Sequence, residues 1–400
     1  MLQAEVRFTN LRSSAVPAPV GLSGSEMVFC TDYFAARERF CAAVDQLHWQ
    51  RETHPITARG PRGEELTVDV ASSSTDDAAT TLLVTGGIHG VEGFFSSALQ
   101  LAALACWPEF RSRARTLRVV MVHALNPYGF AWVRRANEHN VDPNRNFLCP
   151  GERYEGCPAA YRKLHGWLNP NRPPARWESF RLRAALAVVR HGMPALKQTI
   201  AGGQYEFPQG LFYGGAEPSQ TMKILQANLP RWLQSSRRVL HIDLHTGLGP
   251  WGTYKFLVDD PVHARQERWL CQVFGRDRIE TTDPRGLAYV TRGDIGQWCV
   301  ARFPEVDYTY LCAEFGTYAP LHVVAGLRAE NQAHHWSHRE APETGRAKRR
   351  LQEVFCPQSP DWRRQVLDHG LHVIKTAMLA LDDTPIRFGA GEGNFSESRV

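Results

Sequence analysis

The sequence predicts an α/β fold in which a single β-sheet carries helices on both faces. Short apolar or alternating segments alternate along the chain with longer segments of helical periodicity, as such folds require. No linker of distinct composition divides the chain, and its 400 residues, of which 43% are hydrophobic, suffice for one large domain. We therefore expect one domain rather than two.

The predicted strands are short segments whose apolar side chains are either continuous or alternate with polar ones, as on fully or half-buried strands. They comprise residues 65–70, 82–85, 117–124, 239–244, 254–258 and 308–315. Helical spacing of apolar residues predicts helices over 34–47, 93–106, 177–198, 221–234, 262–274 and 361–381.

Residues 148–237 differ from this alternating pattern. They include a Pro-rich loop, NPNRPPARW, two predicted helices and an aromatic, Gly-rich stretch, GGQYEFPQGLFYGG. We interpret them as a large insertion between two strands, of the kind that often forms the wall or lid of a site. The polar, Gly-rich segment 388–400 predicts a flexible C-terminal tail, which leaves residues 1–387 as the α/β domain.

Charge and cysteine usage exclude several function classes. The net charge of +5 is small for this length, and the one basic cluster, residues 346–350, is interpreted as a solvated helix face rather than a nucleic-acid site. The nine cysteines include no CxxC pair and often stand beside apolar residues, which indicates reduced thiols. The N-terminus lacks the features of a secretory signal, and no segment approaches the roughly 18 apolar residues of a membrane span. We expect a cytoplasmic protein without membrane or nucleic-acid partners.

The stretch TLLVTGGIHGVEG contains the first candidate site. An apolar strand leads into two glycines, and His89 and Glu92 follow three positions apart. The carboxyl ends of strands are where sites assemble in α/β sheets, and an imidazole with a carboxylate suits zinc. An HxxE pattern alone is weak evidence, because such a pair also arises by chance in a chain with 16 histidines.

A third ligand is available at the end of another predicted strand. In VLHIDLHTGLG, His245 closes the apolar segment, while His241 lies four residues earlier and deeper on the same strand face. We interpret His245 as the ligand and His241 as a core histidine. The pair His334 and His338 has a spacing that can bind metal on a helix, but we interpret it as part of a surface helix because no carboxylate accompanies it.

Between these candidate ligands the sequence resembles the zinc carboxypeptidase family, which includes amino-acid deacylases of the aspartoacylase and succinylglutamate desuccinylase group. The family's motifs occur here in the family's order over roughly residues 80–320, and the whole-chain pattern looks like a bacterial branch of it. The matching elements are His89/Glu92, NPYG at 126–129, RRAN at 134–137, DPNRNF at 142–147, His245 and Glu314.

The resemblance implies a mixed, largely parallel twisted sheet of the zinc-carboxypeptidase type and one Zn²⁺ per chain, held by His89, Glu92 and His245. It implies that Glu314 is the general base and that Arg135 stabilises the developing oxyanion, a role that Arg134 takes if the register is shifted by one. Two further roles are implied by the DPNRNF run. Asn144 and Arg145 match the residues that bind a substrate's terminal carboxylate, and Asp142 matches a carboxylate that orients a histidine ligand.

One family feature has no match. The family's peptidases carry a mobile tyrosine ahead of the catalytic glutamate, where this chain has Trp298-Cys299-Val300. Tyr205, Tyr213 or Tyr289 are the candidates for that role.

The resulting hypothesis is a zinc-dependent hydrolase that cleaves an amide bond next to a free carboxylate in a small-molecule or peptide substrate. One alternative is an N-acyl-amino-acid deacylase of the aspartoacylase type, and a second is a metal- or carboxylate-binding protein without turnover. A serine hydrolase has little support, because GLSGS at 21–25 lacks the final glycine of a nucleophile elbow.

Overall fold

The computed structural model describes residues 28–382 except 74–77, 114–115, 176–179, 181–183, 185, 187, 190–191, 235, 259–263 and 282–290. The described strands form one sheet in the order β1-β2-β4-β3-β5-β8-β6-β7. Their bounds are β1 Gln50–Arg59, β2 Glu65–Ser72, β3 Thr80–Gly86, β4 Arg118–His123, β5 Arg238–Thr246, β6 Tyr254–Val258, β7 Ile279–Thr281 and β8 Asp307–Phe315. The central pairs β4–β3, β3–β5 and β5–β8 are parallel, while β1–β2, β2–β4 and β6–β8 are antiparallel. The predicted mixed, largely parallel sheet is therefore confirmed.

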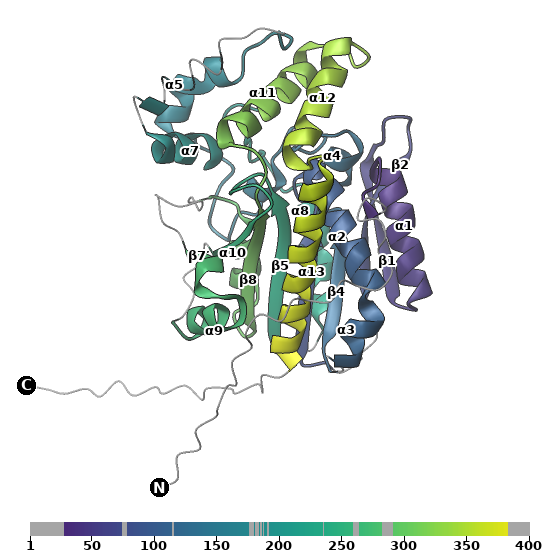
Figure 1. The fold of residues 1–400 in the computed structure, drawn as a ribbon. Helices are drawn as coiled ribbons and strands as arrows, with labels where there is room; N and C mark the ends of the chain where they lie inside the picture. The colour runs from purple at the N-terminus through teal and green to yellow at the C-terminus, as the bar shows by residue number, and fades with distance from the viewer. Residues whose placement is uncertain are drawn as a thin grey trace, which may run out of the picture.

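Helices cover both faces of this sheet, because neighbouring strand residues point to opposite sides. On β3, Leu82 and Val84 pack into one apolar cluster with helices α1, α2, α9 and α13, and Leu83 packs into a second cluster with α8 and α10. The described helices are α1 Tyr33–Gln46, α2 Gly93–Ala105, α3 Trp107–Arg113, α4 Pro127–Ala131, α5 Ala159–Leu168, α7 Met193–Ala201, α8 Gln220–Leu233, α9 Ala264–Phe274, α10 Ile295–Arg302, α11 Pro320–Trp336, α12 Pro342–Phe355 and α13 Pro360–Asp382, with short 3₁₀ turns η2 Gly90–Glu92, η3 Pro143–Arg145 and η4 Arg276–Arg278. In Figure 1, α5, α7, α11 and α12 gather at one end of the sheet.

All six predicted strands are present, and the segment 254–258 coincides with β6. Two strands escaped prediction for physical reasons. β1 is an edge strand with the sequence QRETHPITAR, of which only Ile56 is fully buried, so it shows little apolar pattern. β7 contains only Ile279–Thr281 and leaves no readable period.

Two helix predictions were wrong in detail. The predicted helix 177–198 is interrupted, because Gly192 adopts a φ of +77°, which a glycine tolerates and an α-helix excludes, and α7 begins after it at Met193. His334 and His338 do not share a helix, since α11 ends at Trp336 and places His338 in the exposed turn beyond it. The predicted helical i, i+4 histidine pair therefore does not exist.

The segment interpreted as an insertion, residues 148–237, lies between β4 and β5 and contributes α5, α7 and α8. All nine cysteines are free thiols, of which Cys299 and Cys356 are fully buried. Across the described part of the chain, every helix is too short or too polar to cross a membrane. The predicted tail 388–400 and the N-terminal segment judged for a secretory signal lie outside the described residues.

The sheet brings three distant segments to one edge. β3, β5 and β8 are adjacent and parallel, so the residues that follow or end them meet there. The register pairs Gly86 with Leu244, and it pairs His245 with Glu314. Because cross-strand partners point to the same face, the side chains of His245 and Glu314 lie next to each other.

Candidate metal centre and active site

The loop that follows β3 is shaped by glycines. Gly87 has a φ of +68°, and a Cβ at Gly90 would meet the backbone of Gly129 at 2.1 Å. The turn is also tied to the arginine segment, since the N–H groups of Gly90 and Val91 donate to the carbonyls of Arg135 and Arg134 at 3.1 and 2.8 Å. The motif therefore needs glycine both for its backbone angle and for close packing.

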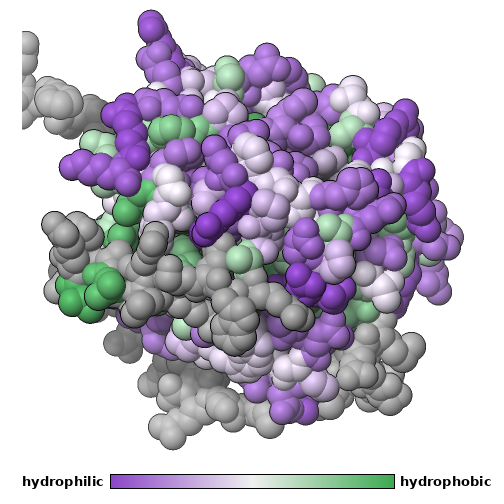
Figure 2. Space-filling view, turned by 90° about the horizontal axis from the view of Figure 1, so that it is seen from above, coloured by the Kyte–Doolittle hydropathy of each residue, from purple (hydrophilic) through white to green (hydrophobic). Residues whose placement is uncertain are grey.

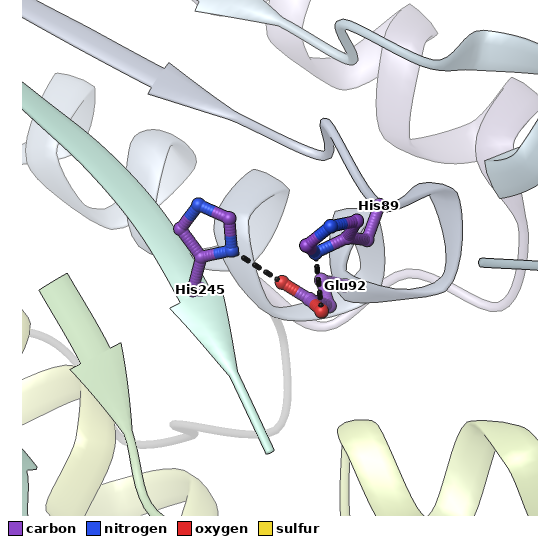
Figure 3. A group of neighbouring side chains, drawn as sticks. All are labelled: His89, Glu92 and His245. Atoms are coloured by element: carbon purple, nitrogen blue, oxygen red, sulfur yellow. Dashed lines mark hydrogen bonds and ion pairs between the residues drawn. The ribbon is translucent and has the colours of Figure 1, made fainter. Parts of the chain in front are cut away.

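His89, Glu92 and His245 converge in the buried space beside this turn (Figure 3). Nδ1 of His89 lies 2.9 Å from one Glu92 oxygen, and Nδ1 of His245 lies 3.1 Å from the other. The possible ligand atoms of the three residues all lie within 4.8 Å of one another, and each residue is at most 4% exposed. The structure thus brings together the three residues that the sequence nominated as metal ligands.

The surroundings of His245 fit a cation at this position. Its Nε2 lies 2.6 Å from Asp243, so both ring nitrogens face carboxylates. A neutral imidazole carries a single N–H, so this arrangement requires either a second proton or a metal ion at Nδ1. Two imidazole nitrogens and one carboxylate are also the donor set of many catalytic zinc sites.

The charges within the cluster act on one another. Burial works to raise the pKa of Glu92, but the contacts with His89 and His245 outweigh it and lower that pKa to about 2. Burial lowers the pKa of the His245 imidazole, but Cys312 and Asp243 outweigh it and hold that pKa well above the usual value. Glu92 is therefore an anion in this site, as a metal-binding carboxylate must be.

Asp243 is a site residue that the sequence reasoning missed. Besides His245, its carboxylate accepts hydrogen bonds from the hydroxyl of Thr85 at 2.6 Å and from that of Tyr310 at 3.2 Å. His241 lies behind it, fully buried between Thr85 and Tyr308. The signal was present in HIDLH, because residues two apart on a strand share a face and so place the carboxylate beside His245.

We predict that Asp243→Asn lowers zinc affinity by roughly 10–100-fold, because an amide cannot fix the imidazole tautomer that leaves Nδ1 free for a metal. Competition with a zinc-binding dye measures this affinity. Thr57→Val, a substitution at an exposed hydroxyl on β1, is the control and leaves it unchanged. Equal zinc affinity of Asp243→Asn and the unchanged protein would show that Asp243 does not position His245.

Arg135 and Asp142 lie on the other side of the cluster. Asp142 contacts Nε2 of His89 at 3.2 Å and accepts from Nε of Arg135 at 2.9 Å. Arg135 also places a terminal nitrogen 2.6 Å from Nε2 of His89. If Nδ1 of His89 is a metal ligand, the ring proton is on Nε2, and it is donated to Asp142 rather than shared with the guanidinium.

The neighbouring Arg134 serves a different purpose. Its guanidinium is 1% exposed, points away from the cluster, and donates to Glu330 at 2.9 Å and to Asn140 at 2.8 Å. A buried pair of this kind holds the loop in place, since removing one partner leaves an uncompensated charge. Of the two arginines that the sequence left open, Arg135 is the one beside the candidate ligands.

Asn144 and Arg145 occupy different environments. Asn144 lines the cavity at the candidate metal centre, and its side-chain oxygen accepts from the N–H of Ile295 at 3.0 Å. The Arg145 guanidinium is 1% exposed and donates to the carbonyls of Ala201, at 2.7 and 2.9 Å, and of Asn144, at 2.6 Å. It does not line that cavity, and here it anchors η3 to the end of α7.

We predict that Arg145→Ala lowers the free energy of unfolding by about 2–3 kcal/mol, because it leaves buried carbonyl oxygens without donors. Urea denaturation measures the change, and Arg153→Ala, at a side chain that is 80% exposed, is the matched control. Unchanged stability with a raised KM for carboxylate substrates would instead support the role in binding a substrate carboxylate that the family resemblance implies.

Glu314 lies beside His245, and their possible ligand atoms lie within 4.8 Å of each other. One of its oxygens accepts from the N–H of Leu248 at 2.8 Å. Burial and, second, the negative charge of Glu92 raise the pKa of Glu314 to about 7. A carboxyl group with such a pKa both accepts and releases protons near neutral pH, as a general base requires.

Neither Tyr205 nor Tyr213 lines the cavity. Tyr205 donates to the carbonyl of Arg145 at 2.8 Å, and the backbone of Tyr213 accepts from Asp142 at 2.7 Å. Tyr289 lies outside the described residues. The tyrosine that is mobile in the family's peptidases has no counterpart within the part of the chain that the structure describes.

A cavity of about 150 Å³ opens at this centre. Its walls include His89, Glu92, His245 and Glu314 together with Arg135 and Lys197, so it joins the candidate ligands to a candidate base and to cationic side chains. Thr246 and Thr291 also line it, and both hydroxyls are buried without a hydrogen-bond partner among the described residues.

Comparison with known proteins identifies the family of this chain. A model described as a protein of unknown function, DUF2817, matches residues 29–369. The chain belongs to the DUF2817 family. No curated protein matches this DUF2817 chain.

Several solved structures are similar to the DUF2817 chain. A candidate metallopeptidase from Shewanella amazonensis is 16% identical, with 83% of this chain and 97% of that chain covered and a TM-score of 0.42. Carboxypeptidase A from Helicoverpa armigera is 11% identical, with 80% and 73% covered and a TM-score of 0.42. Murein-tripeptide amidase MpaA from Escherichia coli O157 is 18% identical, with 70% and 91% covered and a TM-score of 0.34.

Proposed function

We propose that this protein is a metal-dependent hydrolase that cleaves an amide bond next to a free carboxylate. The observation that carries the proposal is the convergence of His89, Glu92 and His245 in one cavity with Glu314 beside them. A zinc ion held by the first three residues supplies Lewis acidity that polarises an amide carbonyl and acidifies water.

The chain's own residues account for the remaining chemistry. Glu314, with its raised pKa, takes a proton from the attacking water and returns it to the departing amine. Arg135, at the cavity wall, provides fixed positive charge for the oxygen on which negative charge develops. Asp142 and Asp243 hold the two imidazoles in orientation from outside the cavity.

The carboxylate requirement has support in two cationic side chains of the cavity wall. Arg135 and Lys197 both line it, and a cationic side chain is the usual partner of a substrate carboxylate. The carboxypeptidase and the N-acyl-amino-acid deacylase versions of this reaction use the same residues and differ in which side of the amide is large.

Hydrolysis of paired substrates tests the proposal. Purified protein loaded with zinc is assayed on N-acyl amino acids and short peptides, each with a free C-terminal carboxylate and as its C-terminal amide. We expect hydrolysis of the free acids, loss of activity with a chelator, recovery with added zinc, and much slower hydrolysis of the amides. Turnover that persists in the chelator would contradict the metal-dependent mechanism, and absence of turnover in a zinc-loaded protein would favour a binding protein.

A further inference from the structure

The cavity at the candidate metal centre has one polar and one apolar end. The polar end carries the candidate ligands, Glu314, Thr246 and Thr291. Beyond them the walls are almost entirely apolar, and they include Phe180, Val188, Leu196, Ile200, Val324 and Leu327. Apart from Lys197, which stands between Leu196 and Ile200 on α7, no residue of this end has a role in the functions assigned above.

Three separate elements build the apolar end. Phe180 and Val188 come from the helical residues described between 180 and 189, Leu196 and Ile200 from α7, and Val324 and Leu327 from α11. On α7, Leu196 and Ile200 are one turn apart and therefore share the face that lines the cavity. The segment 148–237 thus contributes two of the walls, and the helix that follows Glu314 contributes the third.

The surface outside these helices has a different character. Seen from above, the molecule is hydrophilic over most of this side, with hydrophobic residues gathered mainly near one edge (Figure 2). The apolar side chains of α7 and α11 are largely withdrawn from that surface, since Leu196, Ile200 and Leu327 are only 7%, 8% and 4% exposed. They line an internal space that is continuous with the candidate metal centre.

The apolar walls of this space determine which kind of molecule binds there. Walls of Leu, Ile, Val and Phe at this end of the cavity give water few hydrogen-bond partners and favour apolar molecules. A polar peptide side chain would lose its hydration there without gaining partners. An aliphatic chain would gain the free energy of leaving water.

We propose that the substrate carries an extended apolar chain, which lies in this end of the cavity while its amide lies at the metal centre. The inference rests on the proposed function and gives it a substrate class, namely lipophilic amides. The chain belongs either to an acyl group or to the side chain of the residue that bears the carboxylate, and both sources share the same chemistry.

Two substrate series test the proposal. In the first, the acyl group on one amino acid is lengthened from acetyl through octanoyl to dodecanoyl, and in the second the acyl group stays acetyl while the amino-acid side chain is lengthened. We expect kcat/KM to rise in one series by roughly fourfold for each methylene that becomes buried. The series that responds identifies the source of the chain.

A matched pair of variants locates the effect. Val188 lines the cavity, whereas its neighbour Val189 is 86% exposed and does not. Val188→Asp should lower the dodecanoyl-to-acetyl ratio of kcat/KM at least tenfold, because the apolar chain then meets a charge, and Val189→Asp should leave that ratio unchanged. Val324→Phe fills the same space with an apolar group and should also lower this ratio. It provides a second test if Val188→Asp does not fold.

A binding measurement separates this inference from the proposed function. Calorimetry compares dodecanoyl hydroxamate with acetohydroxamate on the zinc-loaded protein and needs no turnover. Tighter binding of the long-chain compound, lost in Val188→Asp, supports the apolar site even if no amide is hydrolysed. Equal affinity of the two hydroxamates, or kcat/KM values that do not depend on chain length in either series, would overturn it while leaving metal-dependent hydrolysis intact.

Discussion

Glu314→Gln is expected to lower kcat by about 10²–10⁴-fold on any amide that the protein hydrolyses, with little change in zinc content. Glutamine keeps the size of the side chain and an oxygen that can accept from the N–H of Leu248, but it cannot take a proton from water. Metal binding is spared because the candidate ligands on β5 and after β3 are untouched. Steady-state kinetics with metal analysis of the same sample measures both quantities.

The control for this variant is another glutamate. Glu217 is 81% exposed, and Glu217→Gln should retain full activity. If Glu314→Gln keeps its activity, another group takes the proton and Glu314 is not the base. If the variant loses zinc together with activity, Glu314 is a metal ligand. This outcome is a real alternative because Glu314 lies close to His245.

The candidate site was largely predictable from the sequence because it is built on strand ends. The strands ending before His89 and at His245 and Glu314 have continuous apolar sequences that mark them as central, and parallel neighbours in a sheet must end at the same edge. His89 and His245 were nominated from these positions, whereas the role of Glu314 came from the family resemblance. Edge elements such as β1 and β7 lack this apolar signal, and they were not predicted.

What the sequence could not show is how side chains divide their hydrogen bonds. Arg134 and Arg135 are adjacent and chemically identical. They differ because Glu330, on α11 and far away in the sequence, pairs with Arg134. Arg145 matched a family motif, yet its donors are taken by backbone carbonyls, one of them on α7. Such contacts join segments that are far apart in the sequence, and no local sequence pattern predicts which segments will meet.

The apolar end of the cavity was unpredictable for a related reason. The helical spacing within 177–198 indicated an apolar face, but Gly192 divides that segment, and Leu196 and Ile200 of α7 line the cavity together with side chains of α11. The apolar face of a helix either packs against the core or lines a cavity, depending on which element lies opposite it. The spacing of apolar residues in the sequence is the same in both cases.

His245→Ala is expected to have the second large effect, the loss of nearly all bound zinc. The substitution removes one of three ligands and leaves Asp243 and Glu92 buried beside a smaller, uncharged side chain. The affinity should therefore fall by more than the roughly 10–100-fold that loss of a positioning carboxylate causes. His89→Ala should behave in the same way, since Glu92 lies between the two rings.

His139→Ala is the matched control, because that imidazole is 78% exposed and has no part in the cluster. It should keep the zinc content of the unchanged protein. Folding of every variant is checked by urea denaturation, so that loss of metal is not confused with loss of structure.

Zinc stoichiometry after exhaustive dialysis tests most directly whether these three side chains form one metal centre. Elemental analysis should find about one zinc per chain in the unchanged protein and in His139→Ala, and almost none in folded His89→Ala and His245→Ala. Zinc retained by both ligand variants, or no zinc taken up by the unchanged protein, would contradict the account.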